Sequence, residues 1–196
     1  MALSIWFELD IAPCYGRFQR CPATGSGGVD LKQERAEDWW EVEALYDLCF
    51  APGREALSSY RLRDGVLPVA ELCLCLRDEN GALAAAIRYW PVSVGARPVL
   101  LLGPVAVHPT RQGEGLAGLL IRDSLGRARE AGWERVMLVG DAPYYQRFGF
   151  SRLEGVRMPP PTNPARVLGL ELVPGAWEGV AGQVGQFAES GGWLEK

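Results

Sequence analysis

The segment VAVHPTRQGEGLAGLL, from Val105 to Leu120, joins an apolar run to a glycine-rich loop and then to a helical pattern. The run from Val99 to Val107 is almost wholly apolar, as expected of a strand that is covered on both faces. Gly103-Pro104 interrupts this run and predicts a local bulge. Apolar residues then recur at helical spacing from Gly115 to Ala131. The sequence therefore predicts a strand, a loop and a surface helix in succession.

The pattern on either side of this segment alternates between strands and helices. Asn80-Gly81 lies between two apolar runs and is a strong signal for a hairpin of antiparallel strands. Together the elements predict a mixed α/β sheet of about six or seven strands around one core. The further predicted strands cover Val29 to Gln33, Val69 to Arg77, Ala82 to Tyr89, Arg135 to Val139 and Val167 to Val173, and the further predicted helices cover Ala36 to Phe50, Arg54 to Arg63 and Pro143 to Arg147.

Three parts of the 196-residue chain follow from composition. Residues 1–28 contain a stretch rich in glycine and proline without periodicity, which predicts a loop-like N-terminal extension. Residues 29–173 carry the strand and helix patterns and form the predicted domain. Residues 174–196 form a glycine-rich tail with Trp177 and Trp193, which we expect to pack on the domain or at an interface.

Composition also excludes several classes of partner. The chain has 20 Lys and Arg against 24 Asp and Glu, so it lacks the basic balance of a nucleic-acid binder. No apolar run reaches the roughly 20 residues that span a membrane, and no export signal is evident at the N-terminus. The odd count of 5 cysteines favours reduced thiols and a cytoplasmic location.

The cysteines do not predict a metal site. Cys73 and Cys75 project to the same side of a predicted strand, and Cys14 and Cys21 are the other pair that could join them. Structural zinc usually takes pairs separated by two to four residues, whereas these pairs are separated by one and six. We therefore expect buried thiols and no metal.

The loop after Val107 has the composition of a phosphate-binding turn. Gly113 and Gly115 carry no side chain, so backbone N–H groups can approach an anion, and the following helix adds unpaired donors. A plain turn is the alternative. A second alternative is a dinucleotide site, because Gly113, Gly115 and Gly118 fit G-x-G-x-x-G, with Asp141 as a ribose-binding acid. That fingerprint lies tight against its strand, whereas here five residues, His108 to Gln112, intervene.

The same residues resemble the GNAT superfamily of acyl-CoA-dependent N-acetyltransferases, in a bacterial-type branch. The superfamily's pyrophosphate loop has the form Q/R-x-x-G-x-G/A, which Gln112, Gly115 and Ala117 fill, and PYYQRFGF matches its Tyr-x-x-x-Gly-Phe element. The resemblance covers roughly Val29 to Val173. It implies mostly antiparallel strands, a central parallel pair splayed at the acyl-CoA site, and about four flanking helices.

Roles for individual residues follow from this resemblance. Amines in this family attack the thioester directly, and Tyr145 matches the acid that protonates the leaving thiolate. A phenol suits that role, although the Tyr144-Tyr145 pair could also be packing residues. The implied acyl-CoA-binding residues are the backbone groups of Val105, Ala106 and Val107 for the pantetheine arm, and Gln112, Gly113, Glu114, Gly115, Leu116 and Ala117 for the diphosphate.

The general base is left open by the sequence. The strand from Val99 to Val107 carries no carboxylate, so Glu71, Asp141 or a water chain could take the amine proton. We expect His108 to orient the loop. Trp39 and Trp40 could border an acceptor pocket, but a core and rim pair is the simpler interpretation.

The resemblance implies an N-acetyltransferase that moves an acetyl or short acyl group from acetyl-CoA to a primary amine of a small molecule or peptide. Neither the acceptor nor the acyl-chain preference follows from the sequence. A homodimer is an open option, since members of this family often pair. The alternative from another class is a non-catalytic acyl-CoA-binding or sensing domain, with nucleotide-dependent redox chemistry as a third.

Overall fold

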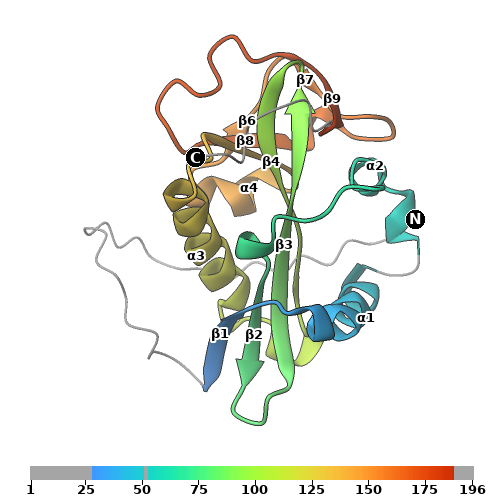
Figure 1. The fold of residues 1–196 in the computed structure, drawn as a ribbon, viewed down its shortest axis with the longest axis vertical. Coiled ribbons are helices and arrows are strands. Elements are labelled where there is room, and N and C mark those ends of the chain that lie inside the picture. Colours follow the sequence, from blue (N-terminus) through green and yellow to red (C-terminus); the bar gives the residue numbers. More distant parts are fainter. Residues whose placement is uncertain (1–27, 51–52, 188–196) are drawn as a thin grey trace.

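A 9-stranded mixed sheet runs through residues 28–50 and 53–187, which are the residues that the computed structural model describes (Figure 1). Its strands are β1 (Val29–Gln33), β2 (Leu74–Asp78), β3 (Leu83–Val94), β4 (Arg97–Val107), β5 (Arg135–Val139), β6 (Ser151–Arg152), β7 (Val156–Arg157), β8 (Val167–Glu171) and β9 (Gly182–Gln186). The order is β1-β2-β3-β4-β5-β8-β6, with β9 beside β3 and β7.

The pairing confirms the predicted fold class, a mixed α/β sheet with a central parallel pair. β4 and β5 run parallel, whereas the neighbours on either side of this pair are antiparallel. A second parallel pair, β7 with β9, lies off the main path. The sheet exceeds the six or seven predicted strands because β6 and β7 are 2-residue strands, too short to show a period of two in the sequence.

The helices and turns lie on both faces of the sheet. The α-helices of the described residues are α1 (Trp39–Phe50), α2 (Ser58–Arg61), α3 (Leu116–Glu130) and α4 (Ala142–Tyr145). The 3₁₀ turns there are η1 (Ala36–Asp38), η2 (Arg54–Ala56), η3 (Ala70–Leu72), η4 (Pro109–Arg111), η5 (Gln146–Phe148) and η6 (Pro164–Arg166). None of the helices in this part of the chain is long and apolar enough to cross a bilayer.

Several of the predicted elements differ in detail from the structure. The strand expected over Ala82 to Tyr89 continues to Val94, and the strand expected over Val167 to Val173 ends at Glu171. The helix expected over Arg54 to Arg63 is divided at Leu57, whose extended backbone (φ −66°, ψ 143°) separates η2 from α2. The strand expected to begin at Val69 begins at Leu74, because residues 70–72 close the 3₁₀ turn η3. At Leu57 an extended residue divides the predicted helix, and at residues 70–72 a turn takes the place of the predicted start of the strand.

The bulge predicted at Gly103-Pro104 is present in β4. Ile87 of β3 lies opposite Val105, and Tyr89 lies opposite Leu102, so Gly103 and Pro104 together face the single residue between them. An extra residue on one strand bends that strand and increases its local twist. The bulge therefore bends β4 immediately after its last pair with β5.

Alternation along β3 divides the core between two faces. Ala85 and Ile87 belong to the cluster that packs with α3, whereas Ala86 belongs to the cluster that packs with α1. Successive side chains of a strand point to opposite faces, so α3 and α1 cover opposite faces of the sheet. Figure 1 shows these two helices on either side of the long β3–β4 pair.

The C-terminal segment adds the last strand to this frame. β9 pairs with β3 at residues 92–94, and Val184 is buried with Val92 and Val94 in a third apolar cluster. The predicted N-terminal extension, with Cys14 and Cys21, lies outside the described residues except for Gly28.

Candidate functional site

The parallel strands β4 and β5 separate toward their C-terminal ends. They pair only at Leu100 with Val136 and at Leu101 with Met137, while β4 continues to Val107. The other edge of β4 stays paired with β3 as far as Val107. The backbone edge of β4 that faces β5 therefore has no strand partner beyond Leu101 among the described residues. This opening contains the predicted arm-binding residues Val105, Ala106 and Val107.

The glycine loop follows β4 at the end of this opening. Gly113 and Gly115 have positive φ angles of 86° and 78°, in the left-handed region that glycine adopts without strain. No heavy atom lies within 4 Å of a Cβ built on either glycine, so both backbones border open space. The predicted loop residues from Gln112 to Gly115 are exposed, Leu116 is buried and Ala117 is partly buried.

Helix α3 supplies the donors that the loop was predicted to present. Leu119 makes the first backbone hydrogen bond of this helix, donating to the Gly115 carbonyl at 3.1 Å. The amides before Leu119 have no intrahelical acceptor, and they form the positive end of the helix dipole. An anion at this point meets unpaired N–H groups as well as a favourable field.

Glu114 of the loop is paired with Arg111, whose Nη1 also lies 3.9 Å from Asp78 Oδ2 at the end of β2. Glu114 accepts hydrogen bonds from Arg111 Nε at 2.7 Å and Arg111 Nη2 at 2.8 Å. This contact lowers the pKa of Glu114 below its ordinary value. His108 caps η4, where its Nδ1 lies 2.8 Å from the Thr110 hydroxyl, which agrees with the predicted role in orienting the loop. Pairing Glu114 with Arg111 reduces the repulsion that a free carboxylate would exert on a bound anion.

Tyr145 lies at the end of α4, and its ring is packed in the core. Its exposed fraction is 8%, and its ring contacts those of Tyr144 and Phe150 at centroid distances of 5.0 and 5.9 Å. A Cβ on Gly140 would lie 2.3 Å from the Tyr145 ring, so only glycine fits beside it. Burial raises the pKa of Tyr145 above its ordinary value, and the phenol is protonated at neutral pH.

The two carboxylates considered as general bases occupy different places. Glu71 is exposed on η3, at the start of β2, and β3 separates β2 from β4 in the sheet order. Asp141 is exposed at the N-cap of α4, two residues after the end of β5, and makes no side-chain capping bond. Of the two, Asp141 adjoins a strand that borders the opening, whereas Glu71 does not.

A buried group of paired arginines on the α1 face was not predicted. Arg88 of β3 is 1% exposed and bonds to Glu34, at distances down to 2.6 Å, and to Glu43. Arg54 bonds to Glu43 and, at 2.7 Å, to Asp47. The Arg88 guanidinium also stacks 3.9 Å from the Trp39 ring, whereas Trp40 is 72% exposed. A lone arginine inside AAAIRYW was the signal that could have pointed to this cluster.

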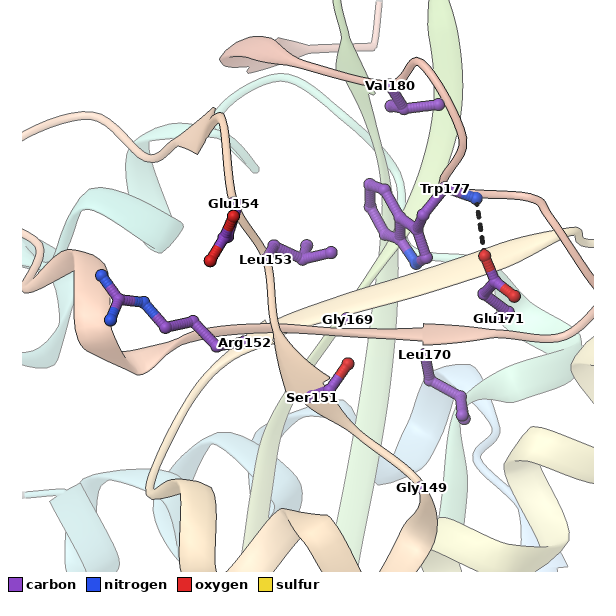
Figure 2. A pocket seen from close by; sticks show the side chains of 10 residues that line it. All are labelled: Gly149, Ser151, Arg152, Leu153, Glu154, Gly169, Leu170, Glu171, Trp177 and Val180. Carbon is purple, nitrogen blue, oxygen red and sulfur yellow. Dashed lines mark hydrogen bonds between the residues drawn. The ribbon is translucent and has the colours of Figure 1, made fainter.

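A pocket of about 560 Å³ lies between β6, β8 and the segment that follows β8 (Figure 2). In it Trp177 stands over β8 beside Leu153, and the Trp177 amide donates to Glu171 at 3.1 Å. None of the predicted site residues is among the residues that line it, which are Gly149, Ser151, Arg152, Leu153, Glu154, Gly169, Leu170, Glu171, Trp177 and Val180. The pocket is therefore separate from the β4–β5 opening.

A metal-binding arrangement is absent from the described residues. No three His, Cys, Asp or Glu side chains come together there as candidate ligands. Cys73 and Cys75 are both buried, and burial raises the pKa of each thiol to about 12. A protonated thiol is a poor metal ligand, so these two cysteines serve as core residues.

Comparison of the sequence with known proteins identifies a family and individual relatives. Residues 39–150 match the model of the Acetyltransferase (GNAT) family. YhbS of Escherichia coli K12, named an uncharacterized N-acetyltransferase, is 32% identical over 112 residues, which make up 56% of this chain and 65% of YhbS. The matched part thus spans just under two thirds of that relative. YjhQ of the same strain, also named an uncharacterized N-acetyltransferase, is 39% identical over 64 residues, or 33% of this chain and 35% of YjhQ.

Solved structures of similar proteins share the fold. A crystal structure of Escherichia coli YhbS in complex with CoA superposes with a TM-score of 0.72 at 27% identity, covering 85% of this chain and 93% of that one. A GNAT family acetyltransferase from Brucella melitensis in complex with acetyl-CoA gives 0.63 at 28% identity, covering 83% and 98%. The family match extends over the β4–β5 opening, the glycine loop and α4, and the chain belongs to the GNAT acetyltransferase family.

Proposed function

We propose that this protein transfers an acetyl or short acyl group from acetyl-CoA to a primary amine by direct attack on the thioester. The observation that carries the proposal is the opening between β4 and β5, which ends at a glycine loop and the N-terminus of a long helix. The opening offers an unpaired strand edge to an extended chain that contains amides. The loop and the helix N-terminus offer backbone N–H donors to a diphosphate. Acetyl-CoA contains both groups, and the two CoA-bound relatives support this choice of donor.

Acetyl-CoA would lie along the residues predicted to bind it. Backbone groups of Val105 to Val107 would pair with the pantetheine arm, and the loop from Gln112 to Ala117 would hold the diphosphate. A strand amide at this edge would also stabilise the oxyanion that forms when the amine attacks. These roles use the main chain, so the unpaired strand edge and the positive φ of the two loop glycines matter more than side-chain chemistry.

Proton transfer completes the proposed reaction. The Tyr145 phenol, which is protonated at neutral pH, would donate its proton to the departing CoA thiolate. The attacking amine would lose its proton to Asp141 or to water. Asp141 is the better placed of the two predicted carboxylates because it follows β5 at the edge of the opening. The odd number of cysteines favours a reducing compartment, so we place this reaction in the cytoplasm.

The first test is a thermal-unfolding titration of the protein with acetyl-CoA, CoA and NAD. A ligand that binds the folded state raises the melting temperature, so we expect a saturable rise with acetyl-CoA and none with NAD. A panel of primary amines then tests transfer through amine-dependent release of CoA. Absence of a shift with acetyl-CoA would refute the proposal. Binding without release for any amine would instead favour the non-catalytic acyl-CoA-binding domain.

A further inference from the structure

Arg63 places a guanidinium beside the bulge of β4. The residue follows α2, and its Cζ lies 4.2 Å from the ring centroid of Tyr60 and 4.6 Å from that of Trp90. Its Nη2 is 3.9 Å from the position that a Cβ on Gly103 would occupy. Gly103 comes two residues after Leu101, where the last β4–β5 pair is made. Arg63 therefore reaches β4 at the point where the opening begins.

The guanidinium of Arg63 lacks acceptors for part of its donor set. Nε and Nη1 are buried and have no hydrogen-bond partner among the described residues. The Tyr60 side chain interacts with Arg63 by hydrogen bonding, and the rings of Tyr60 and Trp90 attract the positive charge. Ring faces do not accept N–H groups that lie in the guanidinium plane, so Nε and Nη1 stay without an acceptor. Burial lowers the pKa of Arg63 below its ordinary value. A buried N–H group without a hydrogen-bond acceptor costs free energy, so a ligand oxygen that reached Nε or Nη1 would bind favourably.

The neighbouring arginines differ from Arg63 in this respect. Arg54 and Arg88 share Glu43, and each has a second carboxylate of its own, as described above. No carboxylate of the described residues lies within 4.0 Å of the Arg63 guanidinium. Arg54 and Arg88 thus share three carboxylates, whereas Arg63 has no carboxylate partner of its own in this part of the chain. A guanidinium with unpaired donors suits a ligand group that is negatively charged and accepts hydrogen bonds.

Arg63 lies on the face of the sheet opposite to α3 and Tyr145, which belong to the proposed acetyl-CoA site. Trp90 follows Ala86 and Arg88 on the same face of β3, the face that α1 covers, whereas α3 and Tyr145 belong to the opposite face. Acetyl-CoA bound at the loop before α3 would leave the α1 face of the opening to the acceptor amine. Arg63 lies on that face, and the residue as a whole is partly exposed, although its Nε and Nη1 are buried.

Contacts with distant segments fix the chain around Arg63. Gln186 of β9 donates to the carbonyls of Arg61 and Asp64 at 3.1 and 2.8 Å. Trp90 Nε1 donates to the Val66 carbonyl at 3.1 Å. Ser58 is hydrogen-bonded to Thr162. Because the segment is anchored on both sides of Arg63, its guanidinium is positioned before any ligand binds.

We propose that Arg63 binds a carboxylate of the acceptor, and that the acceptor is therefore a small amine of the amino-acid type. This assignment rests on the proposed function, since it supposes that an amine attacks a thioester in the opening. A charge-assisted hydrogen bond between the guanidinium and the carboxylate would satisfy a buried donor and orient the amine toward β4. An amine that lacks the carboxylate would leave the donor unpaired and would be disfavoured.

The test compares amino acids with their carboxamides as acceptors, using acetyl-CoA-dependent CoA release. We expect the wild-type protein to prefer the acids. Arg63→Gln should lower kcat/KM for acids by about 10- to 100-fold and change that for the amides little, as expected for the loss of a charged hydrogen bond. Arg63→Lys should retain part of the preference. Arg61→Gln, an exposed arginine on α2, is the matched control and should leave the preference unchanged.

Several outcomes would overturn the carboxylate assignment. Equal use of acids and amides by the wild-type protein would do so, and so would an equal loss for both classes in Arg63→Gln together with an unchanged preference in Arg63→Lys. A preference for phosphoethanolamine over every amino acid would assign Arg63 to a phosphate instead. If Arg63→Gln does not fold, Arg63→Lys gives the decisive comparison.

A binding experiment separates this inference from the proposed function. Thermal unfolding is measured with amino acids and their amides, with and without CoA, in the wild-type protein and in Arg63→Lys. If acetyl-CoA neither binds nor reacts, the proposed function fails, and a stabilisation by acids that the variant weakens would still support carboxylate binding at Arg63. If acetyl-CoA binds but acids stabilise no more than amides and are not acetylated, the carboxylate assignment alone fails.

Discussion

At the scale of the residue, Tyr145 offers the most direct test of the proposed chemistry. Replacing it with phenylalanine removes one hydroxyl and leaves the ring that packs on Gly140, Tyr144 and Phe150. We expect Tyr145→Phe to lower kcat by about 10²- to 10⁴-fold, as for the loss of a general acid, with the dissociation constant of acetyl-CoA little changed. Steady-state kinetics and a binding titration on the same preparation measure the two quantities.

The adjacent residue gives a matched control for this variant. Tyr144→Phe makes the same chemical deletion on the same short helix and should keep kcat within a few-fold of the wild-type value. Turnover of Tyr145→Phe equal to that of the wild-type protein would show that the phenol is a packing group. A solvent molecule would then be left as the acid.

Single residues also show where prediction from the sequence ends. Tyr145 and the loop glycines could be proposed as site residues from the sequence because each lies in a local motif with fixed spacing. Arg63 could not, because its environment is made by Tyr60, Trp90 and Gly103, which come from α2, β3 and β4. No spacing within the sequence encodes which separate segments the fold brings together.

At the scale of the element, the N-terminus of α3 carries the proposed diphosphate site. Gly115 has φ 78°, and the space where its side chain would stand is open in the structure. Gly115→Val should therefore cost about 1–2 kcal/mol in unfolding free energy through backbone strain, and it should weaken acetyl-CoA binding at least about tenfold, or about 1.4 kcal/mol. Calorimetric titration with acetyl-CoA measures the affinity, and unaltered affinity would place the diphosphate elsewhere.

The middle of the same helix supplies a variant with the opposite effect on stability. Gly126 lies inside α3, has no positive φ, and has no heavy atom within 4 Å of a built Cβ. We expect Gly126→Ala to raise the free energy of unfolding by about 0.5–1 kcal/mol, because glycine is a poor helix former. Acetyl-CoA affinity should not change. Urea unfolding monitored by circular dichroism checks the first expectation, and destabilisation would indicate a packing constraint at this site.

Elements differ in how far their sequences specify them. The predicted helix from Gly115 to Ala131 and the strand from Arg135 to Val139 match α3 and β5 within one residue, since long periodicity and full burial leave clear patterns. β7 and β9 lack such a pattern, and they form because β9 finds partners in β3 and β7. The separation of β4 from β5 is likewise a property of pairing, which the resemblance implied but periodicity did not show.

At the scale of the whole molecule, buried acids with raised pKa values link stability to alkaline pH. Burial raises the pKa of Cys73 and Cys75 from 9.0 to about 12. Between these pH values the unfolded chain releases thiol protons that the folded chain keeps, so the unfolded state gains stability as the pH rises. Each thiol therefore lowers the unfolding free energy by up to about 1.4 kcal/mol per pH unit in this window.

Buried tyrosines act in the same direction at higher pH. Burial also raises the pKa of Tyr46, Tyr89 and Tyr145 above the ordinary value of 10.0. These tyrosines therefore begin to lower the free energy of unfolding at a higher pH than the thiols do. Urea unfolding at a series of pH values should show a decline that starts near pH 9, where the unfolded thiols titrate. Cys75→Ala should reduce the steepness of that decline by about one proton, whatever its effect on stability at neutral pH. An unchanged slope in this variant would mean that the thiol is already ionised or open to solvent in the folded protein.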